Sequence, residues 1–215
     1  MFLSIKNVPK VSWSSNKPLN LKPKISTFFF LCFGLALFGL GEGLLIVSTT
    51  GASPWSVLAQ GIFLKVGFSV GIITILISIV VLIFWLPLNQ KPGIGTILNA
   101  LIIGFMIDVC IRFVPTPENY IFQLCLALLA VLTVGLGGGI YLVANLGAGP
   151  RDGLMIGLQK KTNLPIAAVR TTLEITVMSV GWYLGGTVGA GTLFFACGIG
   201  PAVALSLYIV RKSFN

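Results

Sequence analysis

The chain has 215 residues, of which 56% are hydrophobic and only 9% are charged, and it contains no histidine. Soluble domains carry about 25% charged residues, so this composition excludes an ordinary soluble protein and indicates an integral membrane protein. Histidine is the residue that most zinc sites and catalytic triads use, and the four cysteines lack the spacing of a metal cluster. We therefore expect no enzyme, no metal site and no cofactor.

The first 24 residues form a polar tail that carries five of the 14 basic residues. A net charge of +9 would suit a nucleic-acid partner, but bases gathered before the first apolar segment are typical of a cytoplasmic flank. We predict a basic cytoplasmic tail at 1–24 and no nucleic-acid partner. The apolar run that follows is longer than the roughly 7–15 residues of a signal-peptide core, which indicates a retained helix.

Six apolar segments are long enough to cross a bilayer, which takes about 20 helical residues. Glycine and proline mark the breaks between them. The segments are 25–49, 68–88, 94–111, 120–146, 165–185 and 187–210. We predict an all-α, polytopic membrane protein with these six transmembrane helices.

The basic residues favour one orientation of these helices. With the N-terminus inside, the cytoplasmic segments hold eleven bases and the outer segments hold only Lys65 and Arg112. Cytoplasmic segments of membrane proteins carry an excess of Lys and Arg. We therefore predict that both termini are cytoplasmic.

The sequence also matches itself at an offset of 96 residues. About 20 of the 74 positions from 39 to 112 are identical to their counterparts from 135 to 208. Each matching unit holds three predicted helices, and an odd number makes the second unit enter the membrane from the opposite side. We predict two inverted three-helix repeats (3+3), at 25–112 and 120–212, joined by a linker at 113–119.

Small residues recur at the same places in both units. Gly39 and Gly43, like Gly135 and Gly139, form a GxxxG ridge on which another helix can pack closely. A Gly-Ala-x-Pro element follows each ridge, at 51–54 and 147–150, and opens a segment too short to span a bilayer.

Each of these short segments is predicted to be a helix, at 54–67 and 150–163. Ser53 suits an N-cap, and Pro54 suits the first helical position. Such helices either lie in the headgroup interface, which Lys65 and the pair Lys160–Lys161 favour, or enter the membrane as half-helices. In the second arrangement, their N-terminal N–H groups would point at a shared site.

Ionisable side chains inside a membrane helix are costly and point to function. Glu42 lies among glycines in the first predicted helix, and Glu174 lies near the middle of the fifth. Arg170 precedes Glu174 by four residues, so the two form either a neutralising pair or part of a binding site. For Asp108, near Arg112 and the outer end of the third helix, a structural ion pair or a solvated helix end is the favoured interpretation.

Several longer motifs resemble one known group. They are Gly-Leu-Gly-x-Gly from 39, Gly-Ala-Ser-Pro-Trp from 51, Gln-Lys-Pro-Gly-Ile-Gly-Thr-Ile-Leu-Asn-Ala from 90, Ile107-Asp108, Asn-Leu-Gly-Ala-Gly-Pro-Arg-Asp from 145 and Gly-Gly-Thr-Val-Gly from 185. Together they resemble the bacterial YczE/YyaS/YitT family of integral membrane proteins. The resemblance implies a bacterial plasma-membrane location and leaves the activity open. Ser56 departs from the family, which usually has Asp there, and Asp152 fills the matching position in the second unit.

Inverted repeats are typical of secondary transporters, so we predict a small-solute permease or exporter. The alternative is an accessory membrane protein that supports an export or biosynthetic system. An aqueous cavity would favour transport, and a solid core with an exposed glycine seam would favour the accessory role. The expected partners are the lipid bilayer and an unknown small solute, with a homo-oligomer left open. The candidate substrate-contact or coupling residues are Glu42, Asn99, Asp108, Arg170 and Glu174, and the pathway or packing candidates are Gly39, Gly43, Gly51, Pro54, Gly135, Gly139, Gly147, Pro150 and Asp152.

Overall fold

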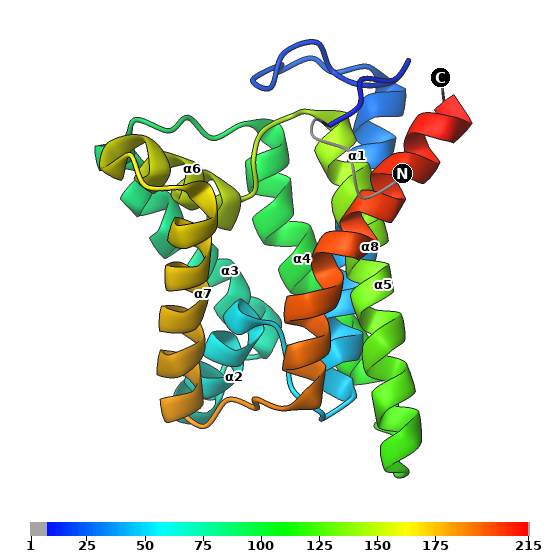
Figure 1. Cartoon of the computed structure of the whole chain (residues 1–215), viewed down its shortest axis with the longest axis vertical. Coiled ribbons are helices and arrows are strands. Elements are labelled where there is room, and N and C mark those ends of the chain that lie inside the picture. The colour runs from blue at the N-terminus through cyan, green and yellow to red at the C-terminus, as the bar shows by residue number, and fades with distance from the viewer. Residues whose placement is uncertain (1–7, 215) are drawn as a thin grey trace.

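The computed structural model describes residues 8–214, which fold into an all-α bundle (Figure 1). The helices are α1 (Ile25–Val47), α2 (Pro54–Val66), α3 (Val70–Trp85), α4 (Ile94–Phe113), α5 (Tyr120–Ala144), α6 (Pro150–Thr162), α7 (Ile166–Tyr183) and α8 (Ala190–Phe214), and a 3-10 turn, η2 (Leu86–Leu88), extends α3.

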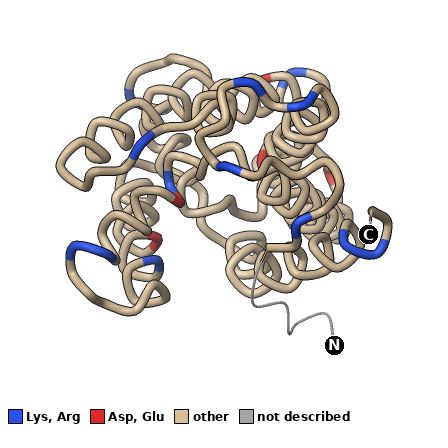
Figure 2. The backbone as a smooth tube through the Cα atoms, turned by 90° about the horizontal axis from the view of Figure 1, so that it is seen from above, with Lys and Arg blue, Asp and Glu red and all other residues tan. Residues whose placement is uncertain are grey.

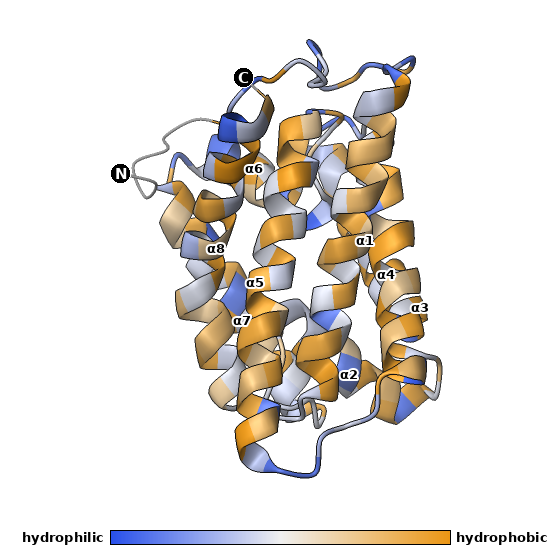
Figure 3. Ribbon diagram, turned by 90° about the vertical axis from the view of Figure 1, so that its right-hand side faces the viewer, coloured by the Kyte–Doolittle hydropathy of each residue, from blue (hydrophilic) through white to orange (hydrophobic). Residues whose placement is uncertain are grey.

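Five helices are long and apolar enough to cross a membrane: α1, α3 together with η2, α4, α5 and α8. Apolar residues cover the sides of the bundle, and the polar segments gather at its two ends (Figure 3). The multi-pass, all-α architecture is therefore confirmed. Helix α7 forms where another span is predicted, but its 18 residues include Arg170, Glu174 and three threonines, which lower its hydropathy. The count of six spans stays a prediction.

The core of the bundle is the pair α1 and α5, flanked by α4 on α1 and by α8 on α5. The glycine ridges lie at these two flanking contacts. A Cβ on Gly39 would lie 2.8 Å from the Cα of Ile103 in α4, and one on Gly135 would overlap Ala202 in α8. Close backbone approach of this kind gives membrane helices their packing energy.

Two crossed sets of hydrogen bonds tie the halves of the chain together. The hydroxyl of Thr96, at the start of α4, donates to the carbonyl of Ala148, before α6 (2.7 Å). The hydroxyl of Thr192, at the start of α8, donates to the carbonyl of Ala52, before α2 (2.9 Å). Backbone N–H groups add the same pattern, from Gly95 to Leu146 (2.8 Å) and from Gly191 to Thr50 (2.9 Å).

The short helices α2 and α6 form as the turn residues predict. The Ser53 hydroxyl accepts a hydrogen bond from the N–H of Ser56 (3.4 Å), and Pro54 is the first residue of α2. Gly51 and Gly147 have φ values of +124° and +117°, in a region that favours glycine. The first residues of α2 are buried, including Trp55.

The two halves differ in how their outer helices pack. Helix α3 lies along α4, whereas α7 stands apart from α8 (Figure 1). Asp108 in α4 accepts hydrogen bonds from the hydroxyl of Ser69 (2.5 Å) and the N–H of Gly71 (2.8 Å) at the start of α3. The second half has no carboxylate at the equivalent position, because Ala204 stands 96 positions after Asp108.

Candidate functional site

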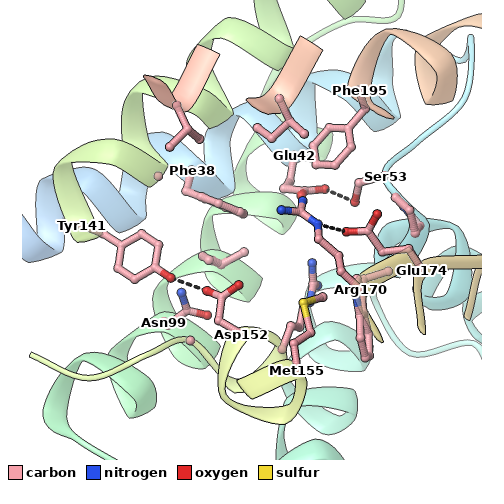
Figure 4. A pocket seen from close by; sticks show the side chains of 18 of the residues that line it. Phe38, Glu42, Ser53, Asn99, Tyr141, Asp152, Met155, Arg170, Glu174 and Phe195 are labelled. Carbon is pink, nitrogen blue, oxygen red and sulfur yellow. Dashed lines mark hydrogen bonds and ion pairs between the residues drawn. The ribbon is translucent and has the colours of Figure 1, made fainter. Parts of the chain in front are cut away.

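A cavity of about 270 Å³ lies inside the bundle and is lined by residues from α1, α3, α4, α5, α7 and α8 and from the N-terminal ends of α2 and α6. Four of the five candidate substrate-contact residues reach it: Glu42, Asn99, Arg170 and Glu174 (Figure 4). The fifth, Asp108, does not.

Asp108 holds two helices together instead. Its carboxylate is bound by Ser69 and Gly71 at the start of α3, and Arg112 lies over the ring of its neighbour Phe113, 5.9 Å from the centroid. The expected Asp108–Arg112 ion pair is absent from the described residues, because the N-terminal N–H and N-cap hydroxyl of α3 already satisfy the carboxylate.

Glu42 is the most deeply buried ionisable residue of the site, with 1% of its surface exposed. Its Oε2 accepts hydrogen bonds from the hydroxyls of Ser53 and Ser56, both at 2.7 Å. Its Oε1 has no hydrogen-bond partner among residues 8–214. One oxygen of this carboxylate is therefore held by residues at the start of α2, and the other is buried without a donor.

Arg170 and Glu174 form the ion pair that their spacing predicts. The Nε of Arg170 lies 2.8 Å from Oε1 of Glu174, on the wall that α7 contributes (Figure 4). The side chains are 50% and 26% exposed, so the pair faces open space rather than packed protein. The pair is thus present, and it is also part of the pocket.

Removing either charge of this pair is expected to lower the free energy of unfolding by only about 0.5 kcal/mol, because partly exposed pairs four residues apart contribute little. Thermal unfolding of Arg170→Gln and Glu174→Gln in detergent measures this. A loss comparable to that of a broken buried pair, about 3 kcal/mol or more, would contradict the exposed arrangement.

Three site residues from α5 and α6 complete the polar lining. The hydroxyl of Tyr141 donates to Asp152 (2.5 Å). The guanidinium carbon of Arg151 lies 5.2 Å from the centroid of the Trp55 ring. Burial lowers the pKa of Arg151, while the charges of Glu42, Asp152 and Glu174 oppose that shift; a guanidinium keeps its proton under such conditions.

Sequence reasoning missed Arg151 and Tyr141. Arg151 was counted among the bases that mark cytoplasmic loops, yet its side chain lines the cavity. One signal could have found it: Arg151 stands 96 positions after Trp55, directly after the proline that starts each short helix.

The cavity lining pairs up at this same offset. Seven pairs of lining residues are 96 positions apart: Glu42 and Gly138, Ser53 and Gly149, Trp55 and Arg151, Thr74 and Arg170, Ser78 and Glu174, Asn99 and Phe195, and Ile103 and Ile199. At two of these pairs a hydroxyl in the first half is matched by a charged group in the second, Thr74 by Arg170 and Ser78 by Glu174. Within residues 8–214, no group of three or more Cys, Asp or Glu side chains gathers into a metal site.

Comparisons with known proteins agree with the motif resemblance. A family of unknown function, DUF6198, matches residues 25–207. An uncharacterised protein of Haemophilus influenzae is 37% identical over 208 residues, which cover 97% of this chain and 94% of the relative. The uncharacterised membrane protein YczE of Bacillus subtilis is 34% identical over 183 residues, 84% of each chain, and YyaS of the same organism is 29% identical over 192 residues, 87% of this chain and 95% of the relative. No solved structure matches the chain.

Proposed function

The chain belongs to the DUF6198 family and is a bacterial multi-pass membrane protein, and from this premise we propose that it is a small-solute permease or exporter of the plasma membrane. The observation that carries the proposal is the cavity inside the bundle, whose lining includes five charged side chains. Charged groups inside a membrane protein are costly and are kept where a solute or ion passes. A transport role also agrees with the expectation that the chain is not an enzyme.

The proposed architecture is six spans in two inverted three-helix repeats, with α7 as the sixth span. The crossed hydrogen bonds support it, because Thr96 and Thr192 bind equivalent loops of the opposite half. The seven matched pairs of lining residues support it as well. A pseudo-two-fold axis through the cavity would make the two ends of the bundle alternative entrances to one site.

The two short helices suit this role. Ser53 and Trp55 at the start of α2, and Gly149 and Arg151 at the start of α6, line the same cavity from opposite ends of the bundle. This supports the half-helix arrangement over the interfacial one. A helix N-terminus has free N–H donors and a partial positive charge. The N-termini of α2 and α6 can therefore stabilise the carboxylates that line the cavity.

The proposed orientation places both termini in the cytoplasm. Residues 8–24, the C-terminal end of α8 and α6, which carries Lys160 and Lys161, lie at one end of the bundle (Figure 1). Lys65, in the last turn of α2, lies at the other end. Basic residues far outnumber acidic ones along the chain (Figure 2). Because cytoplasmic segments carry an excess of Lys and Arg, the end of the bundle with more bases is the proposed cytoplasmic end.

Single cysteines at 65 and 112 are expected to react from outside intact cells, and single cysteines at 91, 160 and 161 are not. The native cysteines are first replaced, and a membrane-impermeant thiol reagent provides the readout. Permeabilised cells, in which all five positions should react, serve as the control. Equal labelling of positions 65 and 161 in intact cells would overturn both the orientation and the inversion.

Transport itself is tested with the purified protein in lipid vesicles. Vesicles are incubated with a bacterial metabolite extract, washed, and analysed by mass spectrometry beside protein-free vesicles. A solute that is retained only in the presence of protein supports the permease. If no solute enters while the protein is folded and correctly inserted, the accessory role replaces this proposal.

A further inference from the structure

We propose that the cavity binds a small protonated amine, and that Oε1 of Glu42 accepts a hydrogen bond from its ammonium group. The inference rests on the proposed transport function, because it names the substrate class of the same cavity. Three observations carry it: an unpartnered carboxylate oxygen, the charge balance of the lining and the aromatic walls.

The first observation is the free oxygen of Glu42. The residue is 1% exposed and lines the cavity, and its Oε1 has no partner in the described part of the chain. A buried acceptor without a donor is costly, and more so when it carries charge. The two serine hydroxyls are already bound to Oε2, so neither supplies the missing donor, and a ligand N–H would complete the carboxylate.

The second observation is the charge of the lining. Three carboxylates, from Glu42, Asp152 and Glu174, face two guanidinium groups, from Arg151 and Arg170. Arg170 is paired with Glu174, and Tyr141 binds Asp152 through an uncharged hydroxyl. One negative charge is left over when all five groups are ionised. A monovalent cation balances it, whereas an anion would double the imbalance.

The third observation is the aromatic part of the cavity wall, together with the size of the space it encloses. Phe38, Trp55, Tyr141 and Phe195 contribute aromatic side chains to the lining, and aromatic faces attract cations. At about 270 Å³ the cavity lies below the roughly 300–1,000 Å³ of pockets that hold drug-sized ligands. The ligand class is therefore a small organic ammonium ion that carries at least one N–H.

The test is binding to the purified protein in nanodiscs, measured by calorimetry against empty nanodiscs. Isopentylammonium is the probe, and isopentanol, isovalerate and tetramethylammonium are its neutral, anionic and donor-free counterparts. Isopentylammonium is expected to bind, and the other three are expected to bind at least tenfold more weakly. Glu42→Gln should weaken the binding of isopentylammonium by roughly ten- to a hundredfold, as for a hydrogen bond to a charged group.

Glu118→Gln is the matched control, since Glu118 is exposed in the loop before α5 and lies outside the cavity. This variant should bind isopentylammonium with the same affinity as the unmodified protein. Leucine adds a carboxylate to the same carbon skeleton. If leucine binds but isopentylammonium does not, and if Arg151→Gln loses the binding of leucine, the ligand is a zwitterion and the proposed amine is wrong.

Failure of the amine and failure of transport give different results. If vesicles retain a solute in a protein-dependent way but isopentylammonium does not bind, the ligand class is wrong and the permease stands. If isopentylammonium binds through Glu42 but no solute crosses the membrane, the site is right and the permease is wrong.

Discussion

Replacing Gly153 by alanine is expected to destabilise the protein severely. A Cβ at this position of α6 would overlap the ring of Trp85, which is 3% exposed. The ring cannot turn aside freely, because its Nε1 donates a hydrogen bond to the carbonyl of Pro150 (2.9 Å). Overpacking at so rigid a contact costs about 3 kcal/mol. The apparent melting temperature in detergent and the yield of monodisperse protein measure the effect.

Gly138→Ala provides the comparison within the same protein. Gly138 lies inside α5, and an added Cβ would meet only side-chain atoms at 3.5 Å or beyond. Alanine is favoured over glycine in a helix by about 1 kcal/mol. The melting temperature should therefore hold or rise. Equal losses in Gly138→Ala and Gly153→Ala would show that the contact with Trp85 is not the cause.

Glu42→Gln is expected to abolish transport and leave the fold intact. A glutamine can still accept from Ser53 and Ser56 through its carbonyl oxygen, so the link from α1 to α2 survives. Its amide carries no charge, and in a low-dielectric site a neutral group is easier to bury than a carboxylate. Melting temperature should thus be unchanged, while the initial rate of solute uptake into vesicles falls at least tenfold, following the loss of a charged hydrogen bond.

Glu118→Gln removes the same charge from an exposed loop and should leave uptake unchanged. The pH dependence of uptake is the second readout, since a carboxyl that exchanges a proton during transport gives the rate a pH profile that Gln removes. Full uptake by Glu42→Gln, with the pH profile of the unmodified protein, would rule out coupling through this residue.

The carboxylates of the two halves come from different helices. In the second half, Asp152 of α6 is bound by Tyr141 of α5. In the first half, Ser56 occupies the position equivalent to Asp152 and is bound to Glu42 of α1. An acid therefore stands at the contact between the long helix and the short helix in both halves, although the motif at Ser56 lacks one.

The helices themselves could be predicted from the sequence. The expected segments 25–49 and 120–146 begin where α1 and α5 begin and extend two residues beyond the C-terminal end of each helix, and the short helices end within one residue of prediction. Such elements follow from local properties: apolar length, the N-cap of Ser53 and the backbone freedom of Gly51. These depend on neighbours in the chain, so one sequence suffices to predict them.

The membership of the candidate site could be predicted only in part. Glu42, Asn99, Arg170 and Glu174 were found because polar groups stand out in apolar helices or motifs. The same criterion selected Asp108, which does not line the cavity, and passed over Arg151, which does. Whether a polar side chain caps a neighbouring helix or lines a cavity depends on the rotation of its helix. Close contacts between distant segments set that rotation, such as those of Gly39 with α4.

The sequence by itself thus determined an all-α membrane protein, its helices and the internal match at 96 residues. Only the tertiary structure decided that the starts of α2 and α6 meet at one cavity, that Oε1 of Glu42 has no hydrogen-bond partner among residues 8–214, and that α7 stands apart from α8. The physical reason is the distance along the chain over which each property is determined. The free energy of placing a helix in lipid is a sum over adjacent residues, whereas a cavity and its unpaired groups exist only once helices far apart in the chain have packed.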